Sequence, residues 1–204
     1  NVGHDYLEDY EERYELYNKK ESRIQFDLEY FNKITKGGLP NKTLNIALAG
    51  TGVGKSLFMC HHASAVLLEG KNVLYITLEM AEEKIAERID ANLLNVNIQE
   101  IVDLPKPIFE SKVTNLAKKT QGSLIIKEYP TASAHSGHFK ALLNELALKK
   151  SFKPDIIFID YLNICASSRY RAAANVNSYS YIKAIAEELR GLAVEANVPI
   201  VSAT

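Results

Sequence analysis

Apolar segments alternate with amphipathic segments along most of the chain. Continuous apolar runs predict buried strands at 43–49, 72–77, 123–128, 155–160 and 199–203. The segments between them predict helices at about 54–69, 82–94, 109–119, 136–150 and 178–195. In the last of these, four apolar residues recur at steps of three and four and indicate a core-facing stripe: Ile182, Ile185, Leu189 and Leu192. This alternation predicts an α/β domain with a mostly parallel central sheet covered by helices on both faces.

The first twenty residues form a separate piece. An aromatic and apolar stripe at helical spacing predicts a helix, with Tyr6, Leu7, Tyr10, Tyr14 and Tyr17 on one side. The first 21 residues contain seven acidic and three basic side chains. Such a helix needs an apolar partner, either on its own domain or on a neighbouring subunit. We therefore divide the chain into a linker helix (1–20) and an α/β core (21–204).

Composition excludes few function classes. Hydrophobic residues make up 47% and charged residues 24% of the chain, and the net charge is −1. No overall basic field indicates nucleic-acid binding, although a few loops suffice for it. Cys60 and Cys165 are too few for a disulfide framework, and we expect buried thiols in a reducing compartment. No apolar run approaches the ~20 residues of a membrane span, and the polar start of the chain is unlike a signal peptide.

A glycine-rich segment joins the first predicted strand of the sheet to a long helix. Residues 49–56 read Ala-Gly-Thr-Gly-Val-Gly-Lys-Ser, in the strand–loop–helix setting of a phosphate-binding P-loop. Glycines let backbone N–H groups converge on phosphates, and the helix adds its positive end. The residues expected to bind the nucleotide are Gly50, Thr51, Gly52, Val53, Gly54, Lys55, Ser56 and Leu57. We expect Lys55 to reach the β- and γ-phosphates and Ser56 to ligate Mg²⁺.

Two acids follow predicted strands at one edge of the sheet. Asp160 ends the strand at 155–160, and we expect it to hold Mg²⁺ directly or through water. Tyr161 follows it, so no second acid lies there to orient the attacking water. Glu79 comes just after the strand at 72–77, at the edge where open α/β sheets bind ligands. It can act on that water as a base, or alternatively cap the helix that begins near Ala81.

Together these motifs resemble those of the DnaB-type replicative helicases. The resemblance rests on the P-loop, on Thr77-Leu78-Glu79-Met80 and on Ile159-Asp160-Tyr161-Leu162. Three further segments look like those of T-even-type bacteriophage helicases: Leu39-Pro40, Tyr129-Pro130-Thr131-Ala132-Ser133-Ala134-His135 and Asn163-Ile164-Cys165-Ala166. The resemblance covers residues 3–204. It implies a RecA-like P-loop NTPase that uses ATP and Mg²⁺ and assembles into a hexameric ring with ATP at subunit interfaces.

The resemblance also implies roles and partners. Glu79 matches the catalytic glutamate, and Lys55 would stabilise the reacting phosphate. Single-stranded DNA, a primase and a helicase loader are the implied partners, in the cytoplasm of a host cell. A sensing glutamine and an arginine finger are expected beyond Thr204. We therefore expect the chain, which lacks an initial Met and stops in a predicted strand, to be a C-terminally truncated piece, mostly monomeric and weakly active.

A loop of small residues runs from Cys165 to Ser178 and contains no acid. The resemblance implies that it lines the ring's central channel. Its candidate DNA-binding residues are Ser168, Arg169, Arg171 and Asn175, because arginines neutralise phosphates and small polar residues let the strand approach. From the residues alone, an ordinary surface loop is the alternative.

Three functions stay open. An ATP-driven helicase that moves along single-stranded DNA is the leading hypothesis. The others are a RecA-type recombinase that forms open filaments, and a nucleotide-binding domain that recruits partners without catalysis. His135 and His138 are spaced for one helix face, but no further metal ligands accompany them. We expect a helix start and a packing residue there, and packing roles for His61 and His62.

Overall fold

Five parallel strands form the central sheet of the computed structural model, which describes residues 3–171 and 175–204. They are β3 (Leu44–Ala47), β4 (Val73–Thr77), β5 (Leu124–Glu128), β6 (Ile156–Asp160) and β7 (Ile200–Ala203). Their spatial order is β3-β7-β6-β4-β5, with β3 and β5 at the edges. All five strands predicted from the sequence are confirmed, with slightly narrower bounds.

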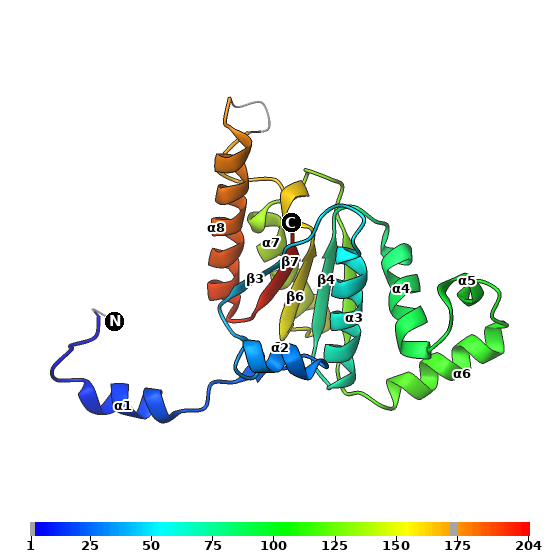
Figure 1. The fold of residues 1–204 in the computed structure, drawn as a ribbon, viewed down its shortest axis with the longest axis horizontal. Coiled ribbons are helices and arrows are strands. Elements are labelled where there is room, and N and C mark those ends of the chain that lie inside the picture. Colours follow the sequence, from blue (N-terminus) through cyan, green and yellow to red (C-terminus); the bar gives the residue numbers. More distant parts are fainter. Residues whose placement is uncertain (1–2, 172–174) are drawn as a thin grey trace.

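Helices cover both faces of this sheet (Figure 1). On one face α3 (Lys55–Leu68) packs on the strands and α4 (Glu82–Leu94) packs on α3. On the other face lie α7 (Ser136–Lys150) and α8 (Ser178–Ala196). The predicted stripe of α8 is confirmed as core, since Ile185, Leu189 and Leu192 are buried.

The strand β4 shows why its sequence is a continuous apolar run. Val73 and Tyr75 pack in the core on the α3 side, whereas Leu74 and Ile76 pack in the core on the α8 side. Alternate side chains therefore enter two different cores, and none faces water. Cys60 and Cys165 are buried free thiols, as expected. No helix in the described parts of the chain combines the length and apolar character that crossing a membrane requires.

The elements that the sequence did not predict are short. They are β1 (Arg23–Ile24), α2 (Glu29–Ile34), β2 (Leu39–Pro40), α5 (Ile98–Ile101) and the 3-10 helix η1 (Leu162–Ile164). None is long enough to set a periodic pattern. β1 and β2 pair antiparallel beside Gly38, where a side-chain Cβ would lie 2.2 Å from the Ile24 carbonyl oxygen. The helix predicted at 109–119 is α6 (Lys106–Ala117), which begins earlier because a proline is tolerated in a first turn.

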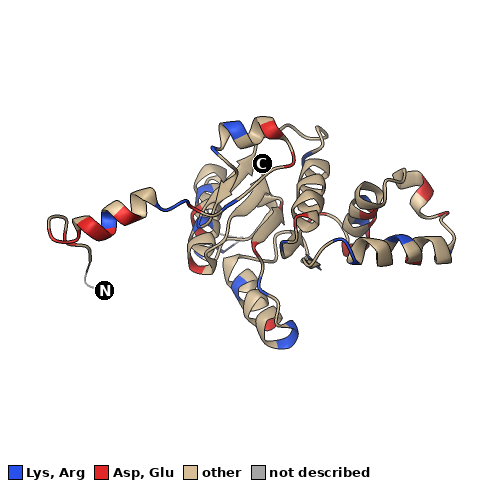
Figure 2. Cartoon of the chain, turned by 90° about the horizontal axis from the view of Figure 1, so that it is seen from below, with Lys and Arg blue, Asp and Glu red and all other residues tan. Residues whose placement is uncertain are grey.

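The N-terminal helix α1 (Tyr10–Asn18) lies apart from the rest of the chain (Figure 1). Figure 2 shows several acidic positions along it. No residue of α1 is buried, and Tyr17 is 75% exposed. The helix does not fold back on its own domain in this structure. Docking of its tyrosines on a neighbouring subunit stays a prediction.

Candidate functional site

The glycine-rich loop lies between β3 and α3, as the sequence predicted. Gly52 and Gly54 have φ of +75° and +102°, in a region of backbone conformation that residues other than glycine rarely adopt. Gly54 is the N-cap of α3, and its carbonyl oxygen accepts a hydrogen bond of 2.9 Å from the Phe58 N–H. The first N–H groups of α3 have no partner within the helix and are available to an anion at its positive end.

A pocket of about 310 Å³ lies at this loop. It is lined by Thr51, Gly52, Gly54, Lys55, Ser56, Leu57, Glu79, Met80, Arg88 and Tyr161. The structure therefore brings most of the predicted phosphate-binding residues together with Glu79. Val53 lines a neighbouring cavity of about 510 Å³ with Gly54 and Lys55, and Gly50 lines neither.

Glu79 is presented on a fixed turn after β4. The Thr77 hydroxyl donates to the Met80 carbonyl oxygen at 2.8 Å and accepts from the Met80 N–H at 3.2 Å. The Thr131 hydroxyl donates to the Leu78 carbonyl oxygen at 2.6 Å. Glu79 itself is exposed. The alternative cap role is not observed, because α4 has Ala81 as its N-cap and no side-chain cap.

Asp160 ends β6 at the same edge of the sheet, paired in register with Thr77. Its side chain is fully buried, and Oδ2 accepts a hydrogen bond of 2.8 Å from the Tyr75 hydroxyl. Oδ1 is buried and has no hydrogen-bond partner. A buried carboxylate oxygen without a partner is costly, so the site fits a cation. Asp160 is not among the residues that line the pocket beside Ser56, and its contact to Mg²⁺, direct or through water, stays a prediction.

Tyr75 was not recognised from the sequence, because a tyrosine in an apolar strand resembles an ordinary core residue. Burial, and secondarily the charge of Asp160, raises the pKa of Tyr75 well above its usual value. The hydroxyl therefore stays protonated and donates a hydrogen bond to Asp160. The Cys60 thiol of α3 lies 3.7 Å from the same hydroxyl. A signal was available, since a buried tyrosine hydroxyl normally has a hydrogen-bond partner.

Two cations line the pocket. The Lys55 Nζ lies 4.9 Å from the centroid of the Tyr161 ring, a cation–π contact. Arg88 comes from α4 and takes part in none of the ion pairs between described residues. A partly buried arginine without an acid suits an anionic ligand. Sequence reasoning missed Arg88, because its place on the pocket depends on how α4 packs on α3.

The predicted DNA-binding residues fall into two groups. The Arg169 guanidinium pairs with the Glu187 carboxylate, and the Ser168 N–H donates to Glu188 Oε1 at 2.9 Å. Arg171 and Asn175 are exposed. Residues 172–174 of the predicted loop lie outside the described residues.

His135 and His138 begin α7 as a capping pair. His135 Nδ1 accepts from the Gly137 N–H at 3.0 Å, and His138 Nδ1 accepts from the His135 N–H at 3.2 Å. The helix start is confirmed, but the packing role expected for His138 is wrong because that ring is exposed. The packing role is confirmed for His62, which is 1% exposed. His61 instead makes a polar contact, since its Nε2 lies 2.5 Å from Asp27 Oδ2. Within the described residues no group of three or more potential metal ligands occurs.

Comparison with known families and sequences gives consistent matches. The family described as DnaB-like helicase C terminal domain matches residues 24–204. The DnaB-like replicative helicase of Enterobacteria phage T4 is 51% identical over 197 residues, which are 95% of this chain and 41% of that protein. A probable plasmid replicative DNA helicase of Chlamydia psittaci is 29% identical over 160 residues, 76% of this chain and 33% of that protein. The chain thus spans less than half the length of these relatives.

Two solved structures share the fold. One, of a DnaB-like replicative helicase and its interactions with primase, has a TM-score of 0.74 and 18% identity. The match covers 98% of this chain and 49% of that chain. The other, the ATPase domain of G40P, has a TM-score of 0.73 and 17% identity, covering 98% of this chain and 71% of that chain.

Proposed function

Since the chain belongs to the DnaB-like helicase C-terminal domain family, we propose that it is the ATP-hydrolysing motor of a replicative DNA helicase. The observation that carries the proposal is the pocket shared by Lys55, Ser56 and Glu79. It joins a phosphate-binding loop to an exposed carboxylate on a fixed turn. A site that only binds nucleotide would not need the carboxylate of Glu79.

The phosphates of ATP would lie against the N-terminus of α3. There the N–H groups of the loop and the Lys55 ammonium neutralise the β- and γ-phosphates. Arg88 adds a second positive charge from α4. Ser56 and Asp160 would hold Mg²⁺, which supplies charge neutralisation when bound. The two residues reach this place from different elements, the P-loop helix and the end of β6.

Glu79 would take the proton of the water that attacks the γ-phosphorus. Its carboxylate is exposed and its backbone is fixed by Thr77, so it can face the nucleotide without a large rearrangement. The P–O bond to the leaving β-phosphate breaks as the water oxygen bonds to the γ-phosphorus. Positive charge on Lys55, and on an arginine from a neighbouring subunit, would stabilise the transition state.

Assembly and partners extend this proposal to the whole protein. Six copies would form a ring, with α1 of each copy docked on its neighbour through the exposed tyrosines. The loop at 165–178 would face single-stranded DNA in the channel, with Arg171 and Asn175 free for phosphates. The DnaB-like relative of known structure interacts with primase. We propose that a primase and a helicase loader are also partners of this protein, and that it acts in the cytoplasm of the host cell.

Electron microscopy of the full-length protein with a non-hydrolysable ATP analogue and forked DNA tests the proposal. Closed six-membered rings around one strand are the expected result. Open helical filaments on DNA would contradict it in favour of a recombinase. Particles that bind nucleotide but neither assemble nor contact DNA would favour a recruitment domain.

A further inference from the structure

Residues 166–169 form the start of the loop at 165–178, and we call them the loop root. A carboxylate of α8 bonds to three of these residues. Glu188 Oε1 accepts hydrogen bonds from the Ser168 N–H at 2.9 Å and the Arg169 N–H at 3.2 Å. It also accepts from the Ser167 hydroxyl at 3.3 Å and from the Ser168 hydroxyl. One side-chain oxygen thus gathers four donors from three consecutive residues.

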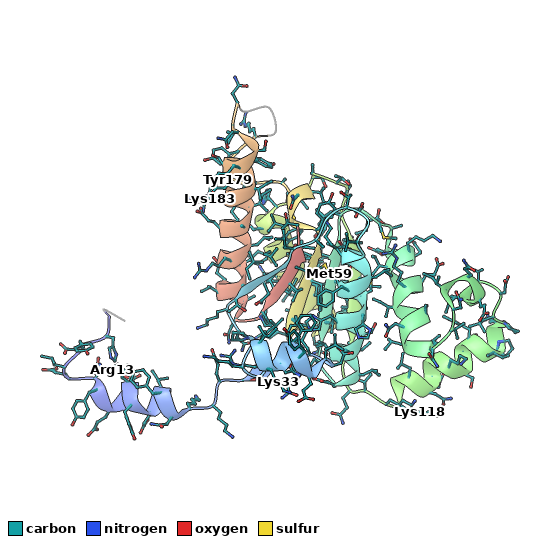
Figure 3. All side chains as sticks on the ribbon, viewed as in Figure 1. Arg13, Lys33, Met59, Lys118, Tyr179 and Lys183 are labelled. Atoms are coloured by element: carbon teal, nitrogen blue, oxygen red, sulfur yellow. The ribbon has the colours of Figure 1, made fainter. Side chains whose placement is uncertain are left out.

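A second side chain of α8, that of Tyr181, fixes Ser167 in the loop root. The Tyr181 hydroxyl oxygen accepts from the Ser167 N–H at 3.1 Å. Tyr181 lies seven residues before Glu188, so the two side chains share one face of the helix. Tyr179 and Lys183 are on the outward face instead (Figure 3). On its other side the root is tied to the start of α7, because the Ala166 N–H donates to the Ala134 carbonyl oxygen at 2.8 Å.

Glu188 is not an ordinary packing residue. Its second oxygen, Oε2, is buried and has no partner, which is an unfavourable arrangement for a carboxylate. Hydrogen bonds to a charged acceptor are about twice as strong as those between neutral groups. The donors on Oε1 all come from the loop and none from the core. The charge at this position therefore serves the geometry of the loop.

The neighbouring acid makes a different kind of contact. Glu187 pairs with the Arg169 guanidinium, and both side chains are about half exposed. Exposed ion pairs contribute little to stability, so a DNA phosphate can replace Glu187 at little cost. Glu188 instead bonds backbone and hydroxyl groups and would stay in place while the arginine changes partner.

We propose that Glu188 is a positioning residue for DNA binding, which orders the loop root so that Arg169 and Arg171 are presented to single-stranded DNA. The inference rests on the proposed function of the loop. Without the carboxylate, the arginines would keep their charge but would have to be ordered each time DNA binds. The loss of order lowers affinity without lowering the number of phosphates that are neutralised.

The experiment compares Glu188→Met and Glu188→Gln in the full-length protein. Methionine keeps much of the side-chain volume and removes every acceptor oxygen, whereas glutamine keeps one neutral acceptor. The matched control is Glu195→Gln on the same helix, which removes only a surface pair with Lys140. The first readout is trypsin cleavage after Arg169 and Arg171 without DNA, mapped by mass spectrometry. We expect roughly tenfold faster cleavage in Glu188→Met, an intermediate rate in Glu188→Gln and no change in the control.

The second readout is the affinity for a labelled oligo-dT at several salt concentrations. Glu188→Met should bind about tenfold more weakly with an unchanged salt slope, and glutamine should restore part of the affinity. In the control Glu195→Gln, both the DNA affinity and DNA-free ATP hydrolysis should match the wild type. Unchanged cleavage, or faster cleavage with wild-type DNA affinity, overturns the proposal. If Arg171→Ala also leaves the affinity and salt slope unchanged, the DNA-binding role of the loop itself is wrong. Should Glu188→Met fail to fold, the comparison of Glu188→Gln with the control decides by the same criteria.

Discussion

The Tyr75 hydroxyl donates a hydrogen bond of 2.8 Å to Oδ2 of Asp160, and both side chains are fully buried. The bond joins the middle of β4 to the end of β6. It occupies one carboxylate oxygen and leaves Oδ1 without a protein partner. Tyr75 therefore orients the acid that we propose to hold Mg²⁺, and the Cys60 thiol links the same hydroxyl to the P-loop helix. This outer contact is the kind that tunes metal sites through their ligands.

Replacing Tyr75 by phenylalanine should weaken the response to Mg²⁺. The change leaves Oδ2 of Asp160 without a donor, at a cost of about 1–3 kcal/mol. We expect the Mg²⁺ concentration for half-maximal binding of a fluorescent ATP analogue to rise about tenfold. Binding without Mg²⁺ should stay unchanged, as should both curves in the control Tyr129→Phe. Superimposable Mg²⁺ titrations of Tyr75→Phe and wild type would refute this role.

Thr77 should control how well Glu79 is aimed. Thr77→Val removes both hydrogen bonds to Met80 but keeps the branched shape, whereas Thr77→Ser keeps the hydroxyl. Because small displacements of a catalytic group are costly, we expect kcat for ATP to fall roughly ten- to a hundredfold in the valine variant. KM should change little, and serine should restore most of the rate. Steady-state phosphate release measures both constants, and equal rates for the two variants would show that the turn does not depend on the hydroxyl.

Arg88 should contribute to nucleotide affinity. It lines the pocket from α4 without an acid partner among the described residues, so its charge is available to phosphate. We expect Arg88→Ala to weaken ATP binding about tenfold, and to weaken ADP binding less because ADP lacks the γ-phosphate. Arg190→Ala, an exposed arginine on α8, serves as the control. Isothermal titration of both nucleotides measures the effect. A wild-type affinity in Arg88→Ala would place the guanidinium away from the nucleotide.

His62 should make folding stability depend on pH. Burial lowers the pKa of His62 from 6.5 to about 4, with His61 acting in the same direction and Asp27 in the opposite one. The folded protein thus resists protonation that the unfolded chain accepts. Stability should be complete above pH 6.5, fall by about 3 kcal/mol as the pH drops to about 4, and level off below.

Urea unfolding at a series of pH values measures this slope. His62→Phe keeps an aromatic ring among Phe26, Phe58 and Phe158 and removes the titration. The difference in stability between variant and wild type should therefore change over that pH window. A difference that is constant from pH 7 to pH 4 would contradict the prediction.

The sequence predicted the strands and long helices because burial repeats along them with a clear period. It could not predict α2 or the β1–β2 pair, which depend on contacts between distant segments. For the candidate site, the P-loop, Glu79 and Asp160 could be proposed from the sequence because each lies at the end of a predicted strand, at one edge of the sheet. Tyr75 and Arg88 were missed because a tyrosine in an apolar strand looks like a core residue and an arginine in an amphipathic helix looks like a surface residue.

The helix α1 and the loop root show a second limit. The tyrosines of α1 predict an apolar partner, but the pattern does not say which molecule supplies it. Arg169 and Ser168 were predicted as DNA-binding residues, and the sequence did not indicate that Arg169 pairs with Glu187 or that Ser168 bonds to Glu188. These contacts join residues about twenty positions apart through the packing of α8. Local composition alone does not contain that information.

Glu79 is the residue that we propose to make this nucleotide site a hydrolytic motor. The most direct test is DNA-stimulated phosphate release by full-length Glu79→Gln, with ATP-analogue binding measured in parallel. Glutamine keeps the size of the side chain and removes its ability to take the proton of the attacking water. We predict that nucleotide binding is retained while hydrolysis falls by at least about a hundredfold. A hydrolysis rate equal to that of the wild type would contradict the account.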